Sequence, residues 1–115
     1  MMTRKADLIA LRDTVQAGKW WGDEGIAKAY CAECGLRKYS SNVHRAMSGS
    51  VDAALEFFAA VLPGWFWTRQ GFVMTVTDDH TGWGSKPHYS ARDDKNPARA
   101  LLIATLNALI DEAVT

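Results

Sequence analysis

Two cysteines at the spacing of a metal or redox motif are the most reactive groups in the sequence. Cys31 and Cys34 form CAEC, and His44 follows ten residues after Cys34. Thiolates at this spacing can chelate zinc, but a structural site needs four ligands, and His80 or His88 could complete the set only through the fold. A redox CxxC follows a strand at the start of a helix, whereas this one falls late in a helical pattern. We therefore expect two reduced cysteines on a helix, with no metal ion and no cofactor.

Serine, histidine and aspartate residues gather at two places, but no third group is evident to orient them. Ser40, Ser41 and His44 could serve as nucleophile and base, and an Asp-Asp-His run occupies positions 78–80. Catalysis by such groups needs a base held in place by a further partner, which closeness in sequence does not provide. The chain also contains no GxSxG, Walker or GxGxxG pattern. We expect that the protein is not an enzyme.

The stretch PGWFWTRQGFVMTV, residues 63–76, predicts a β-hairpin. A two-residue turn at Gln70 and Gly71, with the positive φ at Gly71, would join two strands that alternate in side-chain direction. This turn predicts three cross-strand pairs: Arg69 with Phe72, Trp67 with Met74, and Trp65 with Val76. A third strand from about His88 to Arg92 would complete a small antiparallel meander.

The alternation divides the consecutive aromatic rings between the two faces of this sheet. Trp65 and Trp67 share the strongly apolar face with Phe72, and helices should cover this face. Phe66 lies on the second, more mixed face and is the strand ring that we expect to be exposed. A platform for single-stranded nucleic acid needs a cationic groove beside its rings, and only Arg69 is near them. Core packing is therefore the expected role of the two tryptophans.

Some aromatic residues are left over once the core is assigned, and these are candidates for a partner surface. They are Trp83, Phe66 and Trp21, together with Trp20. Trp83 stands between two glycines in the loop HTGWGSKPH and is the best single candidate for an anchor. The alternative is that Trp83 packs over the second face of the sheet beside Phe66.

Helical patterns account for most of the remaining chain. They are expected at about residues 5–19, 23–34, 40–47, 50–62 and 96–113. Leu8, Leu11 and Val15 form the apolar stripe of the first helix. Ser50 is the expected N-cap of the fourth helix, whose apolar face is traced by Val51, Leu55, Phe58 and Leu62. Asn96 is the expected N-cap of the last helix, and Pro97 fits its first position.

Composition restricts the class of protein. The chain has 115 residues, 48% of them hydrophobic, and its 13 Lys and Arg balance its 13 Asp and Glu. This length favours one domain, and the missing basic excess argues against a nucleic acid partner. No apolar run reaches the roughly 18 residues that would span a bilayer, and no signal peptide is evident. We expect a cytoplasmic α+β domain with a three-stranded antiparallel sheet packed with helices.

Several motifs resemble a family of small proteins from tailed phages and prophages, the phage αβα-sandwich domain proteins. They are GSVDAALEFFAAVLPGWFW and NPARALLIATLNALI, and the resemblance covers about residues 44 to 113. It implies an αβα sandwich-like domain, in which residues 1–48 form a helical N-terminal part and residues 49–115 supply helix, meander and helix. It carries over no catalytic or binding residue, and the CAEC stretch and the Trp83 loop lie outside the pattern.

Two functions of different classes are compatible with these features. The first is a non-enzymatic phage or prophage accessory protein in the host cytoplasm, which binds a host or phage protein, for example to inhibit a host defence protein. The second is a small metal-binding domain or hydrolase that uses Cys31, Cys34, His44 and the cluster from Asp78 to His80. The absence of a recognisable catalytic group favours the first.

Overall fold

The described part of the chain forms five α-helices and one three-stranded antiparallel sheet, which confirms the predicted α+β class. The computed structural model describes residues 5–17, 24–33, 35–79 and 86–113. The elements in order are α1 (Lys5–Gln16), α2 (Glu24–Glu33), a 3-10 turn (Arg37–Tyr39), α3 (Ser40–Met47), α4 (Val51–Val61), β1 (Phe66–Gln70), β2 (Val73–Thr77), β3 (His88–Arg92) and α5 (Pro97–Glu112). Among the described residues, no helix is long and apolar enough to cross a membrane.

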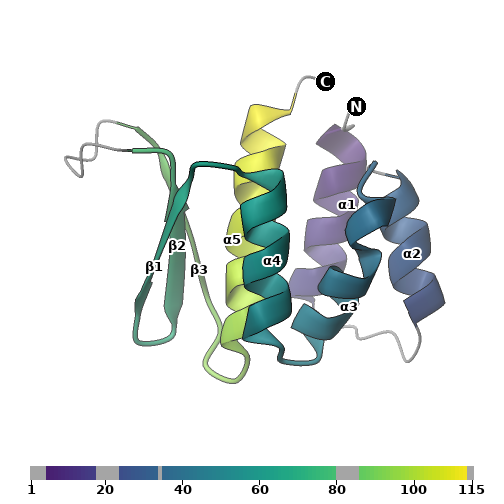
Figure 1. The fold of residues 1–115 in the computed structure, drawn as a ribbon, viewed down its shortest axis with the longest axis horizontal. Helices are drawn as coiled ribbons and strands as arrows, with labels where there is room; N and C mark the ends of the chain where they lie inside the picture. The colour runs from purple at the N-terminus through teal and green to yellow at the C-terminus, as the bar shows by residue number, and fades with distance from the viewer. Residues whose placement is uncertain (1–4, 18–23, 34, 80–85, 114–115) are drawn as a thin grey trace.

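The elements form layers in the order sheet, helix, helix (Figure 1). Helix α5 packs on β2 and β3, and α4 and α1 pack against α5 from the other side. Helices α2 and α3 complete the helical layer farthest from the sheet. The sheet is therefore an outer layer, and its far face is not covered by a described helix.

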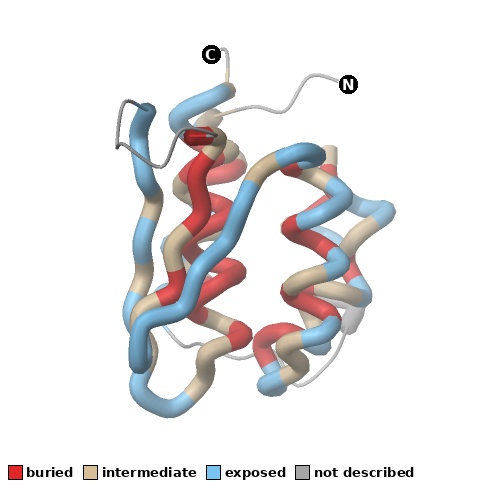
Figure 2. The backbone as a smooth tube through the Cα atoms, turned by 60° about the vertical axis from the view of Figure 1, so that its left-hand side comes forward, coloured by how far each residue is buried: buried red, intermediate tan, exposed pale blue. Residues whose placement is uncertain are grey.

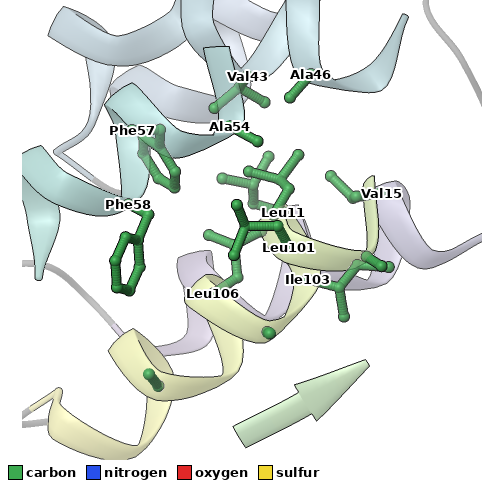
Figure 3. Close-up of a cluster of buried hydrophobic side chains, with 14 of the residues drawn as sticks. Leu11, Val15, Val43, Ala46, Ala54, Phe57, Phe58, Leu101, Ile103 and Leu106 are labelled. Atoms are coloured by element: carbon green, nitrogen blue, oxygen red, sulfur yellow. The ribbon is translucent and has the colours of Figure 1, made fainter. Parts of the chain in front are cut away.

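Helix α5 is the central element of the fold, and its sequence fits that place. The Asn96 side chain accepts a hydrogen bond from Arg99 N at 3.1 Å, and Pro97 occupies the first turn, as predicted. Ten of its residues are buried, and they lie on all sides of the helix because neighbours surround it. In Figure 3, Leu101 and Leu106 lie among side chains from the other helices, including Leu11 and Phe57. The buried Thr105 hydroxyl is satisfied by donating to Leu101 O at 2.8 Å.

Helices α1 and α4 confirm most of the amphipathic pattern. Leu8, Leu11 and Val15 are each 0% exposed. Ser50 caps α4 by accepting from Ala53 N at 3.2 Å, as expected. The expected apolar face of α4 is only partly correct, since Val51 and Leu55 are half-buried while Phe57, which was not assigned to it, is fully buried.

The hairpin turn lies one residue later than predicted. Gln70 pairs with Val73, so the two turn residues are Gly71 and Phe72 rather than Gln70 and Gly71. Gly71 has a φ of 60°, and every positive φ among the described residues belongs to a glycine, so Phe72 has a negative φ. A positive φ at the first turn residue alone is typical of a type II′ turn, whereas the predicted turn placed it second.

The later turn changes the three predicted cross-strand pairs. Trp67 pairs with Val76 instead of Met74, Arg69 pairs with Met74 instead of Phe72, and Trp65 lies just before the paired residues of β1. Each strand residue nevertheless stays on its predicted face, because the partner moves by two positions and side chains alternate with period two. Strand β3 has the predicted bounds.

Two predicted core residues, Trp67 and Phe72, are exposed in the structure. Trp67 is 42% exposed although it lies on the helix side of the sheet, because α5 covers β2 and β3 but not β1. Phe72 is 46% exposed because it belongs to the turn and not to β2. Trp65 is half-buried against the core, with its ring centroid 6.1 Å from that of Tyr89.

Candidate functional site

The exposed apolar side chains of the described residues gather on one hairpin. Phe66, Trp67 and Phe72 are 47%, 42% and 46% exposed, and they are the large hydrophobic residues of the described chain that reach solvent to this extent. All three belong to β1 or to the turn that joins it to β2, and we call them the hairpin surface. Exposed aromatic rings on one edge strand and its turn make this hairpin a candidate contact site, because aromatic residues are enriched in interfaces.

Strand β1 presents this surface because it lies at the edge of the sheet. The strand order is β1-β2-β3, and all five residues of β1 are exposed. Figure 2 shows the same contrast, with β1 exposed along its length and buried segments behind it. The outer backbone groups of an edge strand have no ladder partner within the sheet, so they are available to another strand.

Phe66 and Trp67 point to opposite faces of the sheet. Phe66 lies on the open face, as predicted, where it is opposite Thr77, and Trp67 lies opposite Val76 on the helix side. Trp67 is 42% exposed on this side, whereas Val76 on β2, which packs against α5, is 0% exposed. A partner along β1 would therefore meet an aromatic ring on each face.

Phe72 is held in place by the turn and by a neighbouring cation. The Arg69 side chain donates from Nε to Gly71 O at 2.9 Å, and Asp93 N donates to Phe72 O at 3.2 Å. The Arg92 guanidinium lies 6.0 Å from the ring centroid, at the limit of a cation–π contact. These contacts fix the turn backbone, so Phe72 is presented on an ordered support.

The strands themselves carry no acidic residue. Their sequences are FWTRQ, VMTVT and HYSAR, so Arg69 and Arg92 are the two arginines of the strands, which contain no lysine. Arg92 is paired with Asp94 at 2.8 Å. Arg69, on β1, is the cation that adjoins the two rings of that strand. The chemistry of this edge is thus aromatic and weakly cationic, without the dense positive charge that nucleic acid binding requires.

An open groove of about 670 Å³ lies beside β3 and is a weaker candidate for a site. Of its five charged lining residues, four form the ion pairs Asp93–Arg99, at 2.5 Å, and Arg92–Asp94. Burial opposes ionisation of Asp93, but hydrogen bonds from Arg99, Lys95 N and Asn96 N outweigh it and lower its pKa. These ion pairs and hydrogen bonds stabilise the start of α5, so a structural role accounts for the charged residues of the groove without a ligand.

The described candidates Cys31, His44 and His88 are not brought together as a metal centre. Cys31 is buried on α2, and His44 is half-buried on α3. Cys34 and His80 lie outside the described residues. Among the residues that are described, no group of three or more His, Cys, Asp or Glu side chains could hold a metal ion. Ser40, one proposed nucleophile, is 4% exposed, which hinders access of a substrate.

One of the three predicted partner-surface residues, Phe66, lies in the described part of the chain. Trp83 and Trp21, like Trp20, lie outside the described residues, and Phe66 is exposed as expected. Trp67 and Phe72 are surface residues that the sequence reasoning assigned to the core. A signal for Phe72 was present, because glycine at the first turn position is the type II′ pattern. The sequence contains no comparable signal for Trp67, because its exposure depends on which strands α5 covers.

The motifs that resemble the phage αβα-sandwich family have architectural roles. Ser50 and Asn96 cap α4 and α5, and residues 62–65 lead from α4 into β1. These roles carry no site residue and leave the family assignment a prediction. No protein-family model, curated protein or solved structure matches the chain.

Proposed function

We propose that this chain is a non-enzymatic protein that acts by protein–protein binding through the hairpin surface. The observation that carries the proposal is that Phe66, Trp67 and Phe72 expose nearly half of their area each on one edge strand and its turn. Aromatic residues are enriched in interface hot spots, where a few side chains provide most of the binding free energy.

The backbone of β1 adds a second mode of recognition to these rings. An extended segment of a partner can join an exposed sheet edge, so that main-chain hydrogen bonds supply affinity and alternate side chains supply specificity. Strand β1 pairs with β2 through all five residues without a bulge, and it contains no proline. Its outer edge is therefore straight enough to accept a strand of similar length.

The biological setting of the proposal rests on the motif resemblance. A phage or prophage accessory protein would bind a host or phage protein in the host cytoplasm, and inhibition of a host defence protein is one result of such binding. Support for this setting comes from the helix and strand entry motifs alone. The binding mode on the hairpin is supported separately by exposure and strand order.

Capture experiments with single variants test the proposal. Immobilised protein carrying Phe66→Ser, Trp67→Ser or Phe72→Ser should recover at least about tenfold less of the partner that the unsubstituted chain enriches from bacterial lysate, as for loss of one hot-spot residue. Arg37→Ser, an exposed change in the distant helical layer, is the matched control and should retain capture. Circular dichroism and urea unfolding would exclude variants that fail to fold.

The proposal would be wrong if no protein were enriched, or if all three folded hairpin variants captured the same proteins as the unsubstituted chain. Loss of capture in Arg37→Ser as well would place the contact elsewhere.

A further inference from the structure

We propose that a second copy of this chain occupies the edge of β1. Two β1 strands would pair antiparallel about a two-fold axis at Thr68 and join two three-stranded sheets into one sheet of six strands. The inference rests on the proposed function, because it names an occupant of the same surface.

Strand β1 is the edge that the rest of the fold leaves available. The other edge strand, β3, alternates exposed and half-buried residues, and it lines a groove with Gln16 of α1. Its end carries Arg92 in an ion pair with Asp94. On β1 all five residues are exposed, with no proline, lysine or bulge to block pairing. Natural proteins usually protect an edge by such devices, so their absence points to a strand that is covered in solution.

The number of paired residues and the charge of Arg69 favour one register. With Thr68 opposite Thr68 of the second copy, all five residues pair, Phe66 with Gln70 and Trp67 with Arg69. A shift of the axis to Arg69 would place two guanidinium groups directly opposite each other, which is unfavourable. The axis at Thr68 is therefore the register that pairs every residue of β1 and keeps like charges apart.

The same register makes the edge self-complementary. Each Arg69 would face the Trp67 indole of the other copy on the helix side, where a cation over an indole is the strongest cation–π pair. Symmetry doubles every such contact. The formal net charge of the chain is +0, so no net charge repels the two copies.

The position of the helices leaves room for this pairing. Helix α5 lies over β2 and β3, so the helix side of β1, including Trp67, is open. A two-fold axis perpendicular to the sheet would place both helical layers on one side, with two β1 strands between them. The second copy would cover Trp67, which explains why an indole stands on this face without a helix above it.

Sedimentation equilibrium of the purified chain, over a series of concentrations, tests the dimer directly. The expected mass is twice the 12.7 kDa of one chain. Trp67→Lys places a lysine opposite Arg69 of the other copy and should raise the dissociation constant about 100-fold, from two symmetric like-charge contacts. Adding Arg69→Glu to Trp67→Lys restores opposite charges and should recover most of the affinity. Ala32→Lys, which adds the same positive charge at an exposed position of α2, should leave the constant within about threefold.

Cysteine cross-linking tests the register, and it does not depend on the lysine variants. In Thr68→Cys the two introduced thiols lie directly opposite, at a distance compatible with a disulfide, so mild oxidation should give a covalent dimer. In Gln70→Cys they would be about 14 Å apart along the strands and should not cross-link. Disulfides formed by Cys31 or Cys34 would also appear in the unsubstituted chain.

A monomer at every concentration, a dimer that Trp67→Lys leaves unchanged, or cross-linking of Gln70→Cys as fast as Thr68→Cys would overturn the inference. A monomer that still loses capture on hairpin substitution would refute the dimer and retain the proposed function. A dimer whose hairpin variants capture normally would refute the proposed function alone.

Discussion

The exposure of Trp67 predicts that its removal costs much less stability than removal of a core ring. Trp67→Ala and Phe57→Ala are the informative pair, because Phe57 is 0% exposed and Trp67 is 42% exposed. A large aromatic side chain buries about 150–250 Å² when fully enclosed, so Trp67 loses roughly 120 Å² of contact on substitution. At about 25 cal/mol per Å² this is near 3 kcal/mol, and it falls to about 2 kcal/mol because the extended-chain reference overstates burial.

The Phe57 substitution adds a cavity that the Trp67 substitution does not. Phe57, on α4, is fully buried, and the ring centroid of Tyr39 is 5.8 Å from its own, so its removal leaves space that water cannot fill favourably. We expect a loss of about 3–5 kcal/mol for Phe57→Ala, against about 2 kcal/mol for Trp67→Ala. Urea unfolding at one low protein concentration measures both values without a contribution from association. Equal losses of 3 kcal/mol or more would show that Trp67 is a core residue and would refute the hairpin surface.

Three further predictions concern two side chains with shifted pKa values and the two helix N-caps. Because the pKa of Asp93 is lowered in the folded protein, its carboxylate stabilises the fold at pH values above the unfolded pKa of about 4, and this stabilisation is lost as pH falls through the folded pKa. In urea unfolding from pH 7 to 3, the free energy of unfolding should therefore decline less steeply for Asp93→Asn than for the unsubstituted chain. Burial and the hydrogen bond to Asp111 raise the pKa of Tyr89 to about 12, so the stabilisation from its protonated hydroxyl should be fully present below pH 10 and vanish towards pH 12. Thermal unfolding should show this loss of stability in the unsubstituted chain and not in Tyr89→Phe. Ser50→Ala should cost about 1 kcal/mol and Asn96→Ala more in urea unfolding, because Asn96 also donates to Met47 O at 3.0 Å.

Sequence patterns predicted the elements well where local chemistry determines them. The caps at Ser50 and Asn96, the stripe of Leu8, Leu11 and Val15, and the bounds of β3 all follow from spacing and end signals. These features depend on residues within one or two turns of each other. They are therefore readable without knowledge of the tertiary structure.

The candidate site was less predictable because it depends on tertiary packing. The alternation of side chains correctly predicted that Trp67 lies on the helix side. This side of β1 stays uncovered because α5 packs on β2 and β3, which the sequence does not reveal. Phe72 moved to the surface because a one-residue change in the turn removed it from β2. Sequence thus predicted the direction of a side chain, whereas its exposure required the arrangement of layers.

The central place of α5 also bears on how the chain folds during its synthesis. Helix α5 follows every other described element in sequence, yet both the sheet and the helical layer pack on it. The hydrogen bond from Arg12 to Asn107 joins residues 95 positions apart. Until α5 leaves the ribosome, the hairpin and the earlier helices have no common surface on which to pack together, and such long-range contacts slow folding. A nascent chain stalled before Asn96 would therefore expose the apolar side chains of the sheet and of the helices that α5 covers in the folded protein.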